Sequence, residues 1–92
     1  MRLFACVLAA IVAASTAVVA QRSPGADCDI LWEQRNMIFS NAGYCFKTAD
    51  AIQRFGNAGC RYDDVRDVPL SSRDRQVIAN LQALERRHGC PR

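Results

Sequence analysis

The sequence has few of the residues that most catalytic and metal sites use. Its 92 residues include one histidine, and no two of its five cysteines stand in a C-x-x-C arrangement. A single histidine and widely spaced cysteines argue against a tetrahedral zinc site, so we predict no metal and no cofactor. A chain of this length also excludes multidomain enzymes, cofactor-binding α/β folds and transmembrane bundles.

Acidic residues are absent from the first twenty positions, which are almost entirely apolar. Arg2 is the one charged residue there, and residues 3–14 form an unbroken apolar run that is followed by Ser15 and Thr16. A positive start, an apolar stretch and small residues before Ala20 are typical of a secretory signal peptide. The sequence therefore predicts a signal peptide over residues 1–20 and no stable membrane span after its cleavage; an uncleaved membrane anchor is the alternative.

The remainder of the chain has no strong excess of either charge. Eleven of the twelve bases and all nine acids follow residue 20, which leaves a formal charge of +2. Dedicated nucleic-acid binders carry a much larger positive excess, so we expect no nucleic-acid partner.

The cysteines predict disulfide bonds outside the cytosol. Cys6 lies in the predicted signal peptide, and an even number of thiols in the rest of a small exported chain predicts two disulfides. The four that remain are Cys28, Cys45, Cys60 and Cys90. If the first and last helices pack antiparallel, Cys28 reaches Cys90, while Cys45 and Cys60 flank the short middle helix. Parallel packing would separate Cys28 from Cys90 by roughly 20 Å.

Apolar spacing and capping residues predict three helices. We expect a flexible leader over residues 21–27, a first helix capped by Asp27 or Asp29, a second that begins at Thr48, and a third that opens at Ser71 or Ser72. Glycines are expected to end each helix, at positions 43, 56 and 89. The predicted fold class is all-α: a small three-helix domain over residues 28–92, stapled by disulfides, after a signal peptide.

Arg35 and Asn36 are the strongest candidates for a functional role. Arg35 interrupts the apolar stripe of the first helix, and an unpaired buried charge costs several kcal/mol. We expect Arg35 to meet an acid such as Glu85 or Asp63, and Asn36 to bind a loop carbonyl; an anionic ligand on Arg35 is the alternative. The stripe consists of Cys28, Leu31, Trp32, Ile38, Phe39 and Ala42.

Other candidate residues have simpler structural interpretations. Asp63, Asp64 and Asp67 could hold calcium or act as a glycosidase pair, but adjacent carboxylates point in different directions, and a solvated or arginine-paired loop is favoured. Trp32 and Tyr62 are expected in the core rather than as carbohydrate platforms. His88 is expected at a helix end, where its charge suits the helix dipole.

The stretch LWEQRNMIFSNAGYCF, residues 31–46, resembles the YARHG domain of exported bacterial proteins, which carries the pattern L-x-x-x-R-N-x-I-[YF]-A-R-H-G-Y-x-F. The resemblance extends to Glu85, and its more specific matches are Arg35, Asn36, Gly43, Tyr44 and Phe46. Asn41 and Ala42 replace the Arg and His of the family pattern, so any ligand contact made by those two residues is lost here. Arg87, His88 and Gly89 fall outside the matching register.

The resemblance implies an extracellular, periplasmic or secreted domain with a role at the cell envelope and no defined activity. We therefore expect a non-enzymatic binding or interaction module, whose partner is a cell-wall polymer or an envelope protein. The expected binding residues are Arg35, Asn36, Tyr44 and Tyr62. The alternative is a small secreted hydrolase or enzyme inhibitor that uses Arg35, Asp63 and Asp64; it requires a cleft in which Arg35, Asp63 and Tyr62 converge.

Overall fold

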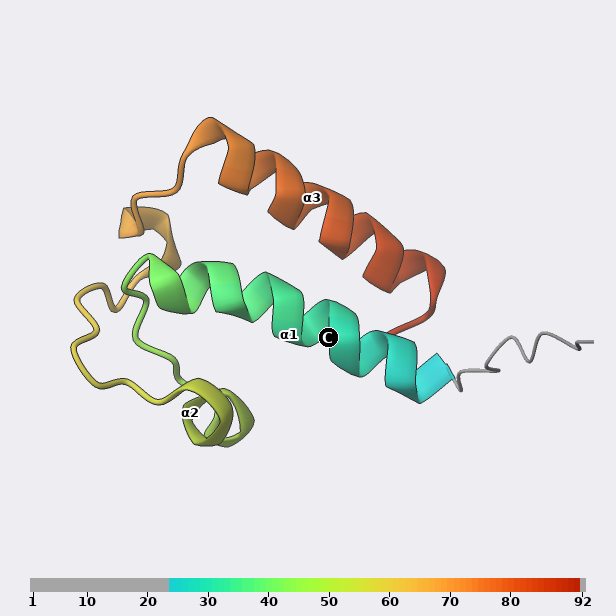
Figure 1. The fold of residues 1–92 in the computed structure, drawn as a ribbon, viewed down its shortest axis with the longest axis horizontal. Coiled ribbons are helices and arrows are strands. Elements are labelled where there is room, and N and C mark those ends of the chain that lie inside the picture. The colour runs from blue at the N-terminus through green and yellow to red at the C-terminus, as the bar shows by residue number, and fades with distance from the viewer. Residues whose placement is uncertain (1–23, 92) are drawn as a thin grey trace, which may run out of the picture.

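The computed structural model describes residues 24–91 and shows an all-α domain (Figure 1). Its elements are α1 (Pro24–Asn41), α2 (Ala49–Phe55), a short 3-10 helix η1 (Val65–Asp67) and α3 (Ser72–Arg87). Within this range the extended pairing is limited to an isolated parallel bridge between Tyr44 and Tyr62. The predicted fold class is therefore confirmed. The predicted signal peptide lies outside the described residues.

Helix α1 is the centre of the domain, with α3 along one side and α2 on the other (Figure 1). The chain runs along α1, crosses to α2, passes through η1 and returns antiparallel to α1 as α3. The start of α1 therefore lies beside the end of α3, as the sequence predicted.

Both predicted disulfides are present. Cys28 is bonded to Cys90 with 5.5 Å between the Cα atoms, and Cys45 is bonded to Cys60 with 5.1 Å. The first closes a sequence separation of 62 residues and joins α1 to the turn after α3. The second closes 15 residues around α2. Together they connect each peripheral element of the described chain to the region of α1.

The start of α1 differs from the prediction. The helix begins at Pro24, so residues 24–27, expected in a flexible leader, are helical, and Asp27 lies in the first turn rather than at a cap. Proline suits this position because its fixed φ matches the helix and its missing N–H would have no helical partner there. An acidic side chain in the first turn also favours the helix dipole.

The other helix boundaries agree with the capping residues. Thr48 Oγ1 accepts a hydrogen bond from the Ala51 amide at 3.3 Å and caps α2, which Gly56 ends with φ +76°. Ser71 Oγ accepts from the Asp74 amide at 3.0 Å and caps α3. His88 ends α3, where its backbone N–H donates to Leu84 O. Local side-chain chemistry therefore defines where these two helices begin and end.

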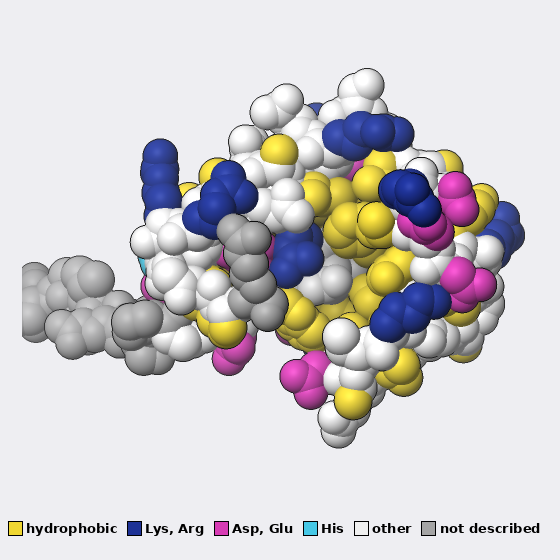
Figure 2. All heavy atoms as spheres, turned by 180° about the vertical axis from the view of Figure 1, so that it is seen from behind, with side chains coloured by type: hydrophobic (Ala, Val, Ile, Leu, Met, Phe, Trp, Pro, Cys, Tyr) yellow, Lys and Arg dark blue, Asp and Glu magenta, His cyan; other side chains and the backbone are white. Residues whose placement is uncertain are grey.

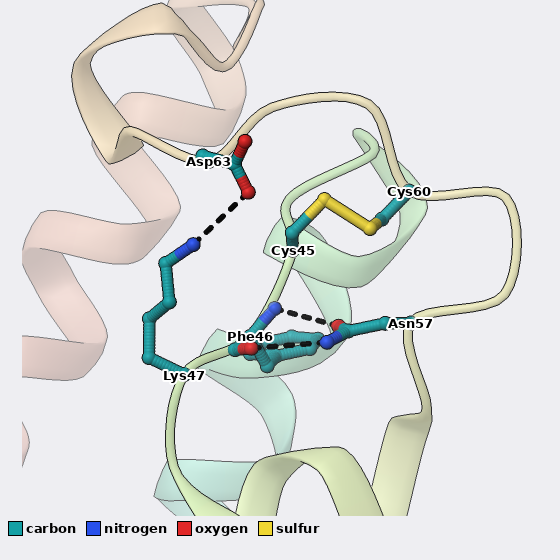
Figure 3. Close-up of a disulfide and its surroundings, with 6 residues drawn as sticks. All are labelled: Cys45, Phe46, Lys47, Asn57, Cys60 and Asp63. Atoms are coloured by element: carbon teal, nitrogen blue, oxygen red, sulfur yellow. Dashed lines mark hydrogen bonds and ion pairs between the residues drawn. A yellow bond between two sulfur atoms is a disulfide. The ribbon is translucent and has the colours of Figure 1, made fainter.

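The core is small, and most of it lies outside α1. Its buried apolar residues are Cys45, Phe46, Ala51, Val68, Ile78 and Leu81. The predicted apolar stripe of α1 is only half-buried, and among the residues of α1 whose burial is described, Asn36 alone is buried. Asn57 supports the core by bracketing Phe46: its Oδ1 accepts from the Phe46 amide at 2.6 Å and its Nδ2 donates to the Phe46 carbonyl at 3.0 Å (Figure 3).

Helix α2 is attached to α1 by an exposed ion pair as well as by apolar contacts. Arg54 donates from Nη2 to Glu33 Oε1 at 2.7 Å and from Nε to Oε2 at 3.1 Å. These hydrogen bonds lower the pKa of Glu33 and raise that of Arg54.

Among the helices of residues 24–91, none combines the length and the apolar composition that a membrane span requires.

We predict that reduction of both disulfides unfolds the domain near room temperature. On the chain-entropy model, loops of these lengths contribute about 3 and 4 kcal/mol, comparable with the roughly 5 kcal/mol of total stability expected at the low end for small domains. The helical circular dichroism of the reduced and alkylated protein should therefore collapse, while that of the oxidised protein treated with the same alkylating reagent should not. A full helical signal after complete reduction would contradict this prediction.

Candidate functional site

Three of the four predicted binding residues line one cavity. Arg35, Asn36 and Tyr44 meet around a volume of about 320 Å³, which we call the aromatic cavity. Its floor is the part of α1 that lies between α2 and α3, and its other lining residues include Trp32, Phe39, Phe46, Lys47, Thr48 and Gln82. The face of the molecule opposite to Figure 1 is hollowed here, and apolar surface gathers in the hollow with charged side chains around its edge (Figure 2).

Arg35 is anchored at the side of this cavity by an acid on α3. Its Nε donates to Glu85 Oε1 at 2.7 Å and its Nη2 donates to Glu85 Oε2 at 3.1 Å, a two-pronged ion pair. The side chains are 23% and 12% exposed, so the pair is largely shielded from water. Of the two acids that the sequence offered as partners for Arg35, Glu85 is therefore the one used. Arg35 Nη1 makes no hydrogen bond with the described residues.

Asn36 is oriented differently from the prediction. Its Nδ2 donates to the carbonyl of Trp32 at 2.9 Å, one turn earlier in the same helix, and not to a loop carbonyl. The reason is geometric, because residues four apart on a helix lie on the same face. Asn36 is 8% exposed, yet no side-chain polar atom of the described residues is both sealed from solvent and without a hydrogen-bond partner. Since Asn36 Oδ1 accepts no hydrogen bond from the described residues, it keeps some exposure to solvent, and Asn36 is one of the residues that line the cavity.

A chain of aromatic rings forms the wall of the cavity and continues around α2. The ring centroids of Phe39 and Tyr44 are 5.8 Å apart, and those of Tyr44 and Phe46 are 5.2 Å apart with an edge-to-face arrangement. Phe46 stacks on Phe55 at 5.3 Å, and Phe55 contacts Trp32 at 5.7 Å. Aromatic contacts in this distance range add about 0.5–1.5 kcal/mol beyond burial alone. The wall is therefore held by neighbouring rings on α1, α2 and the connector between them.

Tyr62 does not line the aromatic cavity. It pairs with the connector instead: the Cys45 amide donates to the Tyr62 carbonyl at 2.8 Å, and the Tyr62 amide donates to the Gly43 carbonyl at 3.0 Å. Its ring lies against Gly43, where an added Cβ would come within 3.3 Å of two ring carbons. Gly43 also has φ +95°, so glycine is favoured there for two reasons. Tyr62 thus positions the connector that carries Tyr44.

The acidic loop is occupied by ion pairs with nearby bases. Lys47 Nζ contacts Asp63 Oδ1 at 3.1 Å (Figure 3). Asp64 accepts from the Arg66 side chain at 2.6 Å and from its amide at 2.9 Å, and these hydrogen bonds lower the pKa of Asp64. Asp63 and Tyr62 do not share a cavity with Arg35 among the described residues, so the convergence that the hydrolase alternative required is not found. Within residues 24–91 there is no group of three side chains that could hold a metal ion.

Two further cavities adjoin the aromatic cavity. One, of about 770 Å³, shares Trp32 and Thr48 with it and is also lined by Asp29, Asp50 and Glu85; we call it the acidic cavity. The other, of about 360 Å³, shares Arg35 and Gln82 with the aromatic cavity and Glu85 with the acidic one. The Arg35–Glu85 pair therefore lies where the three hollows meet.

Sequence reasoning missed Lys47 and Gln82 as residues of the site. Gln82 precedes Glu85 by nearly one turn of α3 and so shares its face, a spacing that could have identified it once Glu85 was paired with Arg35. Lys47 follows the aromatic connector, but only the folding of that connector over α1 brings it to the cavity. His88 lies at the exposed end of α3, away from all three cavities.

Comparison with known proteins identifies the family of the chain. The family model described as YARHG domain matches residues 6–86, and the chain belongs to this family of small extracellular domains. The family match begins earlier in the chain than the motif resemblance, which covers Leu31 to Glu85. No curated protein and no solved structure matches the chain.

We predict that replacing Glu85 by Gln destabilises the domain by about 1–3 kcal/mol, because Arg35 then keeps its charge in a shielded site without a carboxylate. Chemical denaturation of the oxidised protein measures the change. Glu33→Gln is the matched control: it breaks a pair of similar geometry that is exposed to solvent, and it should cost clearly less stability than Glu85→Gln. Equal losses in the two variants would show that shielding of the Arg35–Glu85 pair is unimportant.

Proposed function

We propose that this YARHG-domain protein is an exported, non-enzymatic binding module of the bacterial cell envelope, and that it binds its partner in the aromatic cavity. The observation that carries the proposal is the meeting of Arg35, Asn36 and Tyr44 in that cavity. These are three of the residues by which the chain most resembles its family. They line the floor and wall of a single hollow on an otherwise small and simple fold.

The composition of the cavity supports binding rather than catalysis. No carboxylate or histidine among the described residues lines it, so it lacks the side chains that most often act as general acid or base near neutral pH. What it offers instead is aromatic surface, the basic side chains of Arg35 and Lys47, and the amides of Asn36 and Gln82. Aromatic walls with a few placed polar groups are typical of sites that bind small molecules or segments of larger ones.

Independent features support the proposed location. Both disulfides are formed, which is typical of proteins outside the cytosol. The family is extracellular in type, and the sequence of the first twenty residues is typical of a secretory signal. An exported domain with a binding cavity and an even charge balance suits a partner in the envelope, either a cell-wall polymer or an envelope protein.

We expect the oxidised protein to be retained by isolated peptidoglycan or by envelope extract, and Lys47→Glu to reduce that retention by about ten-fold or more. Lys47 is exposed, so its replacement should leave the fold intact, which circular dichroism verifies. Arg73→Glu is the matched control, since Arg73 is an exposed base that lines none of the three cavities.

Two results would contradict the proposal. Absence of retention by both materials would remove the envelope role. Equal retention of wild type, Lys47→Glu and Arg73→Glu would show that whatever binds does so away from the aromatic cavity.

A further inference from the structure

We propose that the aromatic cavity recognises the carboxyl end of a short peptide. This inference rests on the proposed function and specifies its ligand: a terminal carboxylate, the amide N–H next to it, and the apolar side chain of the last residue. Each of these three groups has a counterpart among the residues that line the cavity.

The carboxylate is matched by the cationic Lys47 and by an N–H of Arg35, whose charge is already paired with Glu85. Arg35 and Lys47 both line the cavity, and no described acid lines it with them. Glu85 occupies Nε and Nη2 of Arg35, which fixes the guanidinium and leaves Nη1 without a partner among the described residues. Among the described residues, Lys47 forms its ion pair with Asp63, and these side chains are 54% and 85% exposed, so that pair can be exchanged for a ligand at little cost. Charge-assisted hydrogen bonds of this type favour an anion with several acceptor oxygens.

The amide N–H is matched by a buried acceptor. Asn36 is more than nine-tenths buried and lines the cavity, its Nδ2 is engaged by the Trp32 carbonyl, and its Oδ1 is neither sealed from solvent nor bonded to a donor among the described residues. The hydrogen bond to Trp32 therefore determines which end of the amide is presented. A ligand that brings an N–H donor beside its carboxylate fits this arrangement better than a plain carboxylic acid.

The apolar side chain is matched by the aromatic wall. Phe39, Tyr44 and Phe46 are held in contact with one another and present ring surface to the hollow. The volume of about 320 Å³ lies at the lower end of the range for small-ligand sites, and so suits one or two residues of a peptide.

The rest of the peptide is directed toward the acidic cavity. That cavity joins the aromatic one at Trp32 and Thr48, and Asp29 and Asp50 line it. Arg54 also lines it but is paired with Glu33, so the acids remain in excess there and disfavour a second carboxylate. The charges of the two cavities therefore define one direction for the chain, with its carboxyl end beside Lys47.

The test titrates three probes into the oxidised protein. Binding is monitored by the changes in the protein's amide chemical shifts in NMR spectra. The first probe is N-acetyl-dialanine with a free carboxylate, and the second is the same compound with a carboxyl-terminal amide. The third keeps the free carboxylate but has an ester bond in place of the last peptide bond, so that it lacks the last N–H. The free acid should bind, and the amide should bind at least about ten-fold more weakly because it has lost the charge. The ester analogue should bind several-fold more weakly, because Asn36 Oδ1 then has no donor. Peptides of L- and D-alanine are compared, and the preferred form indicates whether protein termini or wall peptides are the source.

Variants locate the effect. Lys47→Gln should weaken the binding of the free acid by at least about three-fold and leave the binding of the amide unchanged. Arg73→Gln should change the affinity for neither probe. The proposal is overturned if the acid and the amide bind equally, if neither shifts the amides around the cavity at about 10 mM, or if Lys47→Gln affects both probes alike. If one of these results occurs while envelope retention still depends on Lys47, the proposed function stands and this ligand assignment fails.

Discussion

The Cys28–Cys90 disulfide is the constraint on which the rest of the structure depends. It joins the start of α1 to the turn after α3 and so fixes two long helices side by side in antiparallel register. Arg35 lies seven residues after Cys28, and Glu85 lies five residues before Cys90. These similar offsets place the two side chains opposite each other at one level of the helix pair. The ion pair is thus a consequence of where the two helices are clamped.

The small core explains why such a clamp is needed. Only a few apolar residues of the described chain are buried, and most of α1 is half-buried at best. Hydrophobic burial of that extent offsets little of the conformational entropy lost on folding. The second disulfide, the Asn57 bracket around Phe46 and the chain of aromatic rings stabilise the connector in the same way, by many short-range constraints. The aromatic cavity lies where these constraints meet.

Much of this arrangement could be predicted from residues that act locally. Thr48 and Ser71 define helix starts because their hydroxyls satisfy nearby amides, and the even number of cysteines with one plausible packing gave both pairings. The position of Arg35 in an apolar stripe demanded an acid, and Glu85 supplies it. The role of Lys47 in the cavity and the separation of Tyr62 from it escaped prediction because they depend on how the connector folds over α1. Asn36 was expected to bind a loop carbonyl, but its amide bonds one turn back in its own helix, as local helix geometry allows.

The most direct test of the clamp is native-state hydrogen exchange of the double variant Cys28→Ser/Cys90→Ser, compared with Cys45→Ser/Cys60→Ser. Loss of the longer link should reduce amide protection throughout α1 and α3 by about a thousand-fold, since about 4 kcal/mol of loop entropy returns to the unfolded chain. Protection of α1 and α3 that equals the wild-type level in the Cys28→Ser/Cys90→Ser variant would contradict the account.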